Sequence, residues 1–124
     1  MARAEDYVPG WPRTCGWTLR KWLEENRELV IRFIRACVGA TDWLLEPDNR
    51  EETLQLVMEL EDLSRDRAED AYQRVVPKAR INPEALRRVL DLRIELGVYP
   101  PPHSPPQRFY DAGYWCEATG LPES

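Results

Sequence analysis

The chain has 124 residues and a formal net charge of -5, with basic and acidic residues mixed along its whole length. Because it has no basic arm or stripe, the sequence argues against binding to nucleic acid or to an anionic membrane surface. Its hydrophobic content of 43% is typical of a globular protein rather than a disordered one, and its length predicts one domain.

The N-terminal segment lacks the apolar core of a signal peptide. Pro9, Gly10 and Pro12 interrupt its aromatic residues, and two acids stand at Glu5 and Asp6. No apolar run in the sequence approaches the ~20 residues that are needed to cross a bilayer. We therefore expect no membrane insertion, and we expect the chain, as written, to remain in the cytoplasm.

In chain order, the sequence predicts a mainly α-helical fold. Four main helices are expected near residues 27–46, 49–61, 65–76 and 83–96, followed by a short C-terminal helix. At most one or two short strands are expected, and residues 13–19 are the one segment that favours β-structure.

Helix caps support the first boundaries. Apolar residues recur every three or four positions over residues 19–46, which is the period of an amphipathic helix. Asn26 is the expected cap between a short helix and a long one that ends before Pro47. Asp48, with Glu51 three positions later, resembles a capping box that opens the next helix.

Similar signals bound the remaining helices. Ser64 is expected to start the third main helix, which runs towards Pro77. Asn82 is the predicted N-cap of the fourth helix, Pro83 fits its first turn, and Gly97 stands where a left-handed C-cap is wanted. The five prolines that come soon afterwards predict an extended connector.

Candidate catalytic chemistry is sparse. The single histidine, His103, lies in the proline-rich connector, and the sequence has no glycine-rich phosphate loop and no paired nucleophile and base. Cys15, Cys37 and Cys116 are odd in number and widely spaced, which argues against a disulfide framework and a zinc site. We interpret Cys37 as a small buried hydrophobic residue. No enzymatic activity, metal or cofactor is expected.

Aromatic residues gather near both ends of the chain. Tyr7 and Trp11, in a segment rich in proline and glycine, are the candidate ligand-binding residues, whereas Trp22 at helical register is interpreted as core. The two aromatic groups either form the edges of a ligand cleft or anchor the ends of the chain on something larger.

Several segments occur in an order that is similar to that of a known family. They are "DYVP", the tryptophan followed by "EEN" and "ELV", "DWLLEPDNR", "EALRRVLDLRIELG" and the closing "YDAGYWCEA". Together they resemble the C-terminal part of ABC-transporter solute-binding proteins, of the group that binds aliphatic sulfonates, taurine, nitrate or thiamine-pyrimidine precursors. The resemblance runs from about Ala2 to Ala118.

For the intact receptor, the resemblance implies a type II periplasmic-binding-protein fold, an α/β clamshell that closes on a small sulfonate, nitrate-like anion or pyrimidine. It also implies an ABC permease as partner and a periplasmic location. The present chain would be a single partial domain, equivalent to the C-terminal segment. Its parts would be an extended crossover-like segment (1–18), a helical body (19–98), a proline-rich connector (99–106) and a C-terminal aromatic segment (107–124).

Two functions remain open. The chain is either a C-terminal fragment of an ABC-importer solute-binding protein or a helical oligomeric interaction protein without solute binding. In both cases, helix faces that the rest of a receptor would cover need another partner. We expect a homo-oligomer, in the form of a two-fold dimer, with the aromatic C-terminal segment projected by the connector onto a second copy.

Overall fold

The structure is a computed structural model that describes residues 15–102 and 104–123. Its α-helices are α1 (Arg20–Glu25), α2 (Arg27–Leu45), α3 (Arg50–Glu61), α4 (Arg65–Tyr72), α5 (Pro83–Glu95) and α6 (Gly113–Thr119). Three 3₁₀ turns accompany them, η2 (Pro47–Asn49), η3 (Pro77–Ala79) and η4 (Pro106–Arg108). The predicted mainly α fold is confirmed. Residues 15–19, where a strand was expected, are irregular, and no strand occurs within the described residues.

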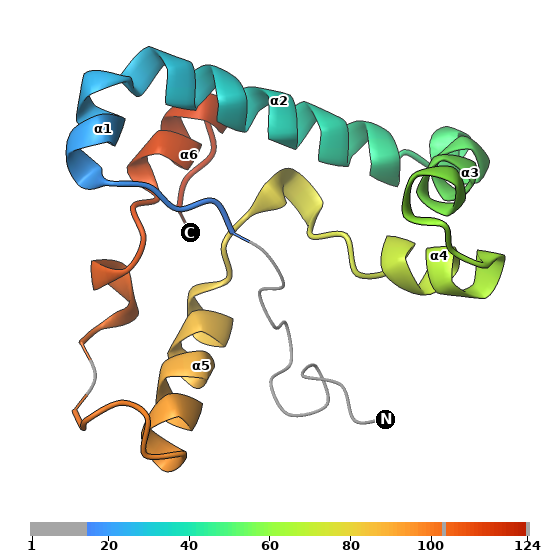
Figure 1. The fold of residues 1–124 in the computed structure, drawn as a ribbon. Coiled ribbons are helices and arrows are strands. Elements are labelled where there is room, and N and C mark those ends of the chain that lie inside the picture. Colours follow the sequence, from blue (N-terminus) through green and yellow to red (C-terminus); the bar gives the residue numbers. More distant parts are fainter. Residues whose placement is uncertain (1–14, 103, 124) are drawn as a thin grey trace.

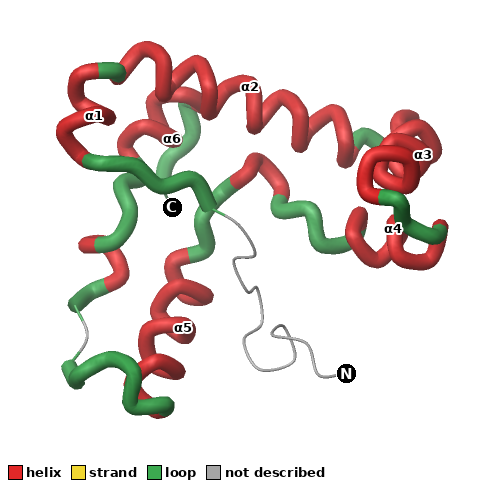
Figure 2. The backbone as a smooth tube through the Cα atoms, viewed as in Figure 1, coloured by secondary structure: helices red, strands yellow, loops and turns green. Residues whose placement is uncertain are grey.

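The helices form an open arch rather than a closed bundle (Figure 1). The long helix α2 runs along the top, with α3 and α4 packed on each other at one end and α6 beneath the other end. The helix α5 descends from the middle of the arch. Among the described helical elements, α5 contacts only η4. Figure 2 shows that loops, rather than continuous helices, join α4 to α5 and α5 to α6.

The apolar pattern of α2 explains its place in the arch. Ile31 is buried, and Ile34 and Val38 on the same side of the helix are half-buried, where α2 packs on η3 and α6. The helix ends at Leu45, because the next residue takes an extended conformation in front of Pro47. The predicted long helix and its end are therefore confirmed.

The caps of α5 are those predicted. The Asn82 side-chain oxygen accepts hydrogen bonds from the backbone N–H groups of Glu84 and Ala85, at 3.0 and 3.2 Å. Gly97 has a φ of +69°, a left-handed conformation that glycine adopts at little cost because it has no Cβ atom. Local sequence signals were therefore sufficient to place both ends of this helix.

Asn26 and Ser64 stand at the predicted starts of α2 and α4, but neither makes a side-chain cap hydrogen bond, and Asp48 is not the cap of α3. The Asn26 amide donates to the backbone oxygen of Trp22 at 2.9 Å, so it serves the end of α1 rather than the start of α2. Asp48 lies inside η2, so α3 starts two residues later without a side-chain cap. Ser64 stands in the predicted place, but its side chain makes no cap hydrogen bond. The helix α4 also ends at Tyr72, short of the predicted residue 76.

The core of the described chain is small. Its buried apolar residues are Ile31, Leu54, Ala68, Ala85, Leu90 and Tyr114. Leu54 and Ala68 lie where α3 packs on α4, and both are completely buried. Cys37, predicted to be buried, is only half-buried. An arch of single helices has too few neighbours on each face to enclose most of its apolar side chains.

Candidate functional site

The helix α6 is docked on α2 of its own chain. The Tyr114 side chain is buried there, and the Arg27 guanidinium lies 4.9 Å from the centre of its ring. Arg27 also pairs with Glu117, and this hydrogen-bonded pair raises the pKa of the Arg27 guanidinium. The Arg35 side chain donates to the backbone oxygen of Ala118 at 3.1 Å. The expectation that the connector projects the C-terminal segment away from its own body is therefore wrong.

Trp115, also in α6, holds the turn η3. Its indole N–H donates to the backbone oxygen of Lys78 at 2.9 Å, and the Arg80 guanidinium lies 5.1 Å from the ring centre. Lys78 and Ala79 have φ values of +59° and +48°, which cost residues with a side chain on the order of 1–3 kcal/mol each. The Lys78 ammonium also pairs with Asp42 on α2 at 2.7 Å. These contacts offset the strain and hold in place η3, the turn that connects α4 to α5.

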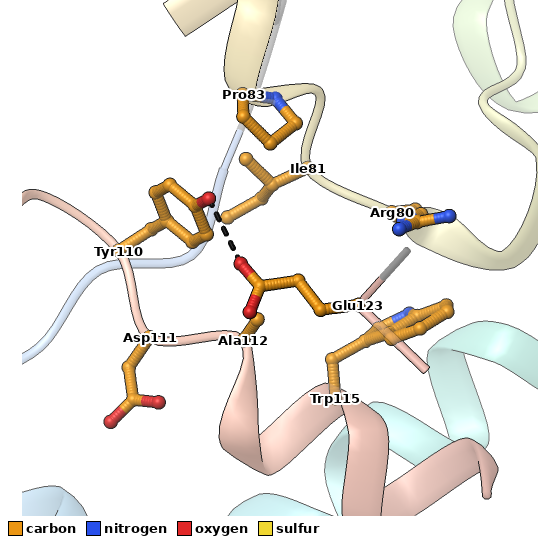
Figure 3. Close-up of a pocket in the computed structure, with 8 residues that line it drawn as sticks. All are labelled: Arg80, Ile81, Pro83, Tyr110, Asp111, Ala112, Trp115 and Glu123. Carbon is orange, nitrogen blue, oxygen red and sulfur yellow. Dashed lines mark hydrogen bonds between the residues drawn. The ribbon is translucent and has the colours of Figure 1, made fainter. Parts of the chain in front are cut away.

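A small pocket lies between α6 and the start of α5 (Figure 3). It is lined by Arg80, Ile81, Pro83, Tyr110, Asp111, Ala112, Trp115 and Glu123. Its volume is about 30 Å³, close to the share of one water molecule in the liquid and far below the ~300–1,000 Å³ of small-molecule sites. A neighbouring depression of about 270 Å³ shares several of these residues but is wide open to solvent. Neither hollow combines the enclosure and the volume of a small-molecule binding site.

The pocket contains a tyrosine with a shifted pKa. Burial raises the pKa of the Tyr110 phenol, and its hydrogen bond to Glu123, at 3.0 Å, raises it further. Because the pKa of this phenol is higher in the folded state, its protonated form stabilises the fold. The stabilisation is fully present at pH values below the ordinary tyrosine pKa near 10, and it is lost as the pH rises through the pKa of the folded state.

Because of this environment of Tyr110, we expect a spectrophotometric titration of the folded chain to contain a tyrosine component that ionises at a pH above the ordinary value near 10. Tyr110→Phe should remove that component, whereas the matched variant Tyr99→Phe should leave it in place. A late component that survives in Tyr110→Phe would contradict the assignment.

The residues predicted to bind ligand, Tyr7 and Trp11, lie outside the described residues, as does His103. Trp22, predicted to be core, is 42% exposed, because the six-residue helix α1 contacts only α2 among the helical elements. Within the described part of the chain, no group of three or more histidine, cysteine or acidic residues is placed to hold a metal. No described helix is long and apolar enough to span a bilayer.

A second feature is an apolar line on the side of α2 that faces away from its buried contacts. We call Leu29, Phe33, Ala36, Ala40 and Trp43 the outer stripe. All five are exposed, and their spacings of four and three residues place them along one side of the helix. Leu29 and Phe33 are 54% and 65% exposed. The sequence showed that α2 is apolar over a wide face, but not that the described residues leave this side of the helix exposed.

Comparison of the chain with protein-family models, with curated proteins and with solved structures gives no match.

Proposed function

We propose that this chain is a non-enzymatic helical interaction unit that packs its uncovered apolar faces on a second polypeptide, namely a second copy in a two-fold dimer. The observation that carries the proposal is an imbalance among the described residues, in which fourteen large hydrophobic residues are exposed and only six hydrophobic residues are buried. Where such residues are contiguous, as in the outer stripe, the exposed apolar surface is typical of interaction surfaces.

The free energy gained by covering the exposed apolar residues is large relative to the stability of the whole domain. Burying one large apolar side chain contributes about 1.5–3 kcal/mol, whereas the whole stability of a domain is about 5–15 kcal/mol. Covering even three or four of the exposed residues therefore changes the stability by an amount comparable to the total. A two-fold dimer covers the same patch on both copies by one contact.

A second candidate function follows from the sequence resemblance. The chain would be the C-terminal part of an ABC-importer solute-binding protein, and the rest of the receptor would cover its apolar faces. The order of the quoted segments from about Ala2 to Ala118 supports this candidate. It brings with it a small sulfonate, nitrate-like anion or pyrimidine as ligand, Tyr7 and Trp11 as ligand-binding residues, an ABC permease as partner and a periplasmic location.

Thermal denaturation at several protein concentrations tests the first candidate. A dimer gains stability from its own concentration by mass action, so the melting temperature should rise by several degrees over a hundredfold increase in concentration. A melting temperature that does not change over this range would contradict the proposal.

Calorimetry tests the second candidate. We expect no micromolar binding of taurine, an alkanesulfonate, nitrate or a thiamine pyrimidine by this chain alone, because the pocket that the described residues form between α5 and α6 has a volume of only about 30 Å³. Micromolar affinity for any of them would favour the receptor function instead. Tyr7→Ala and Trp11→Ala would then be the first variants to measure.

A further inference from the structure

The turn η3 is held by side chains of two helices that are distant from it in the sequence. The Lys78 carbonyl oxygen accepts a hydrogen bond from the indole N–H of Trp115 on α6, at 2.9 Å. The Lys78 ammonium pairs with Asp42 on α2, and the guanidinium of Arg80, just after the turn, lies over the Trp115 ring. Both the backbone and the side chain of Lys78 are therefore fixed from outside the turn.

The backbone of η3 is in a conformation that its own residues do not favour. Lys78 and Ala79 have φ values of +59° and +48°, in the left-handed region that residues with a Cβ atom avoid. Neither is a glycine, an asparagine or an aspartate, the residues that adopt this region most readily. Both are exposed, so burial of their own side chains does not compensate for the strain. The contacts made by α2 and α6 therefore have to stabilise the turn.

The contacts from α6 depend on the docking of a short helix. The helix α6 has seven residues, and Tyr114 is its buried residue. When α6 leaves α2, η3 loses the Trp115 hydrogen bond and ring together, and Lys78 and Ala79 are free to return to the common backbone regions. That relaxation favours the undocked state, because contacts and strain that differ between two states set their populations. Docking of α6 and the conformation of η3 are thus coupled.

We infer that α6 is a latch on η3. While it is docked on α2, α6 holds the strained turn that connects α4 to α5. Its release relaxes that turn and uncovers the side of α2 that carries Ile31, without unfolding the contact between α3 and α4 at the other end of the arch (Figure 1). The latch acts within a single chain, so it goes beyond the proposed dimer and does not depend on it.

Proteolysis by a lysine-specific endoprotease tests the inference, because the chain has two lysines, Lys21 and Lys78, whose cleavage products mass spectrometry separates. In the latched chain the carbonyl of the Lys78–Ala79 bond is hydrogen-bonded and the Lys78 ammonium is paired, so cleavage there requires the turn to open. When opening and closing are fast relative to cleavage, the rate reports the population of the open form. Each rate is divided by that of the same variant unfolded in urea, which removes differences in how well the protease cuts each sequence.

Two substitutions should move this rate in opposite directions. Trp115→Phe keeps a ring but removes the N–H donor, and we expect cleavage after Lys78 to become about fivefold faster. Ala79→Gly removes the Cβ atom that disfavours a φ of +48°, so it favours the latched state, and we expect cleavage to become about fivefold slower. Trp17→Phe is the matched control, because Trp17 is 89% exposed, and it should leave the rate unchanged.

The dependence of the rate on urea distinguishes the latch from unfolding of the whole chain. Release of α6 exposes much less surface than global unfolding does. Below the unfolding transition, the logarithm of the rate should therefore rise with less than about half the slope of global unfolding. Equal slopes would overturn the inference. It would also be overturned if cleavage were no faster in Trp115→Phe than in Trp17→Phe, or no slower in Ala79→Gly than in the unmodified chain.

Discussion

Replacing Leu54 by alanine is expected to lower the free energy of unfolding by about 2–5 kcal/mol. Leu54 is completely buried on α3, which packs mainly on α4 and also contacts α2 and η2. The truncation removes the transfer free energy of the lost methyl groups and leaves a cavity that the surrounding side chains fill only in part. A loss of this size would remove a large part of the stability of a small domain.

Urea denaturation followed by circular dichroism measures this effect. Leu60→Ala is the matched control, because it makes the same change in the same helix at a residue that is 80% exposed. The control should stay within about 0.5 kcal/mol of the unmodified chain. Equal losses of stability in the two variants would mean that the side of α3 that carries Leu54 is not buried.

Replacing Tyr114 by alanine is expected to cost about 3–5 kcal/mol, the range for removing a large buried ring. Tyr114 is the buried residue of α6, and the Arg27 guanidinium lies over its ring. Without this ring, α6 should detach from α2 and release the Trp115 hydrogen bond that holds η3. The C-terminal segment thus stabilises the arch from within one chain.

Two further variants serve as controls for Tyr114→Ala. Tyr114→Phe keeps the ring and should lose little, and Phe109→Ala, at a residue that is half exposed, should cost well under half as much as Tyr114→Ala. Because the chain has five tryptophans, the release of Trp115 would be followed as the difference in fluorescence between the chain and its Trp115→Phe variant during urea denaturation. If the loss in Tyr114→Ala instead depended on protein concentration, α6 would be docked on a second copy rather than on its own chain.

Local signals predicted the helices of this fold well, and the limits of such signals are clear at particular residues. Asn82 and Asn26 are the same residue type and both precede a helix, yet only the Asn82 side chain accepts cap hydrogen bonds from the helix that follows. Asn82 has the extended backbone that a cap requires, whereas Asn26 has φ and ψ of -122° and 30° because it joins α1 directly to α2. This difference in backbone conformation depends on how the preceding segment is folded, and the residues around each asparagine do not predict it.

The candidate site was less predictable, because its contacts join residues far apart in the sequence. Trp115 reaches Lys78 across 37 positions, and Arg27 reaches Glu117 across 90. The aromatic C-terminal segment was recognised from composition, but its docking on its own α2 depends on the return of the chain after the prolines. The outer stripe could be read from helical spacing, although its exposure follows only from the arch.

We propose that this arch covers its apolar faces with a second copy of itself. Static light scattering of the unmodified chain, from low to high micromolar concentration, measures the mass that decides it. The monomer has a mass of 14.5 kDa, and we predict that the measured mass rises to twice this value and then stays constant, as in a closed two-fold dimer. A mass that remains at 14.5 kDa up to high micromolar concentration would contradict the claim.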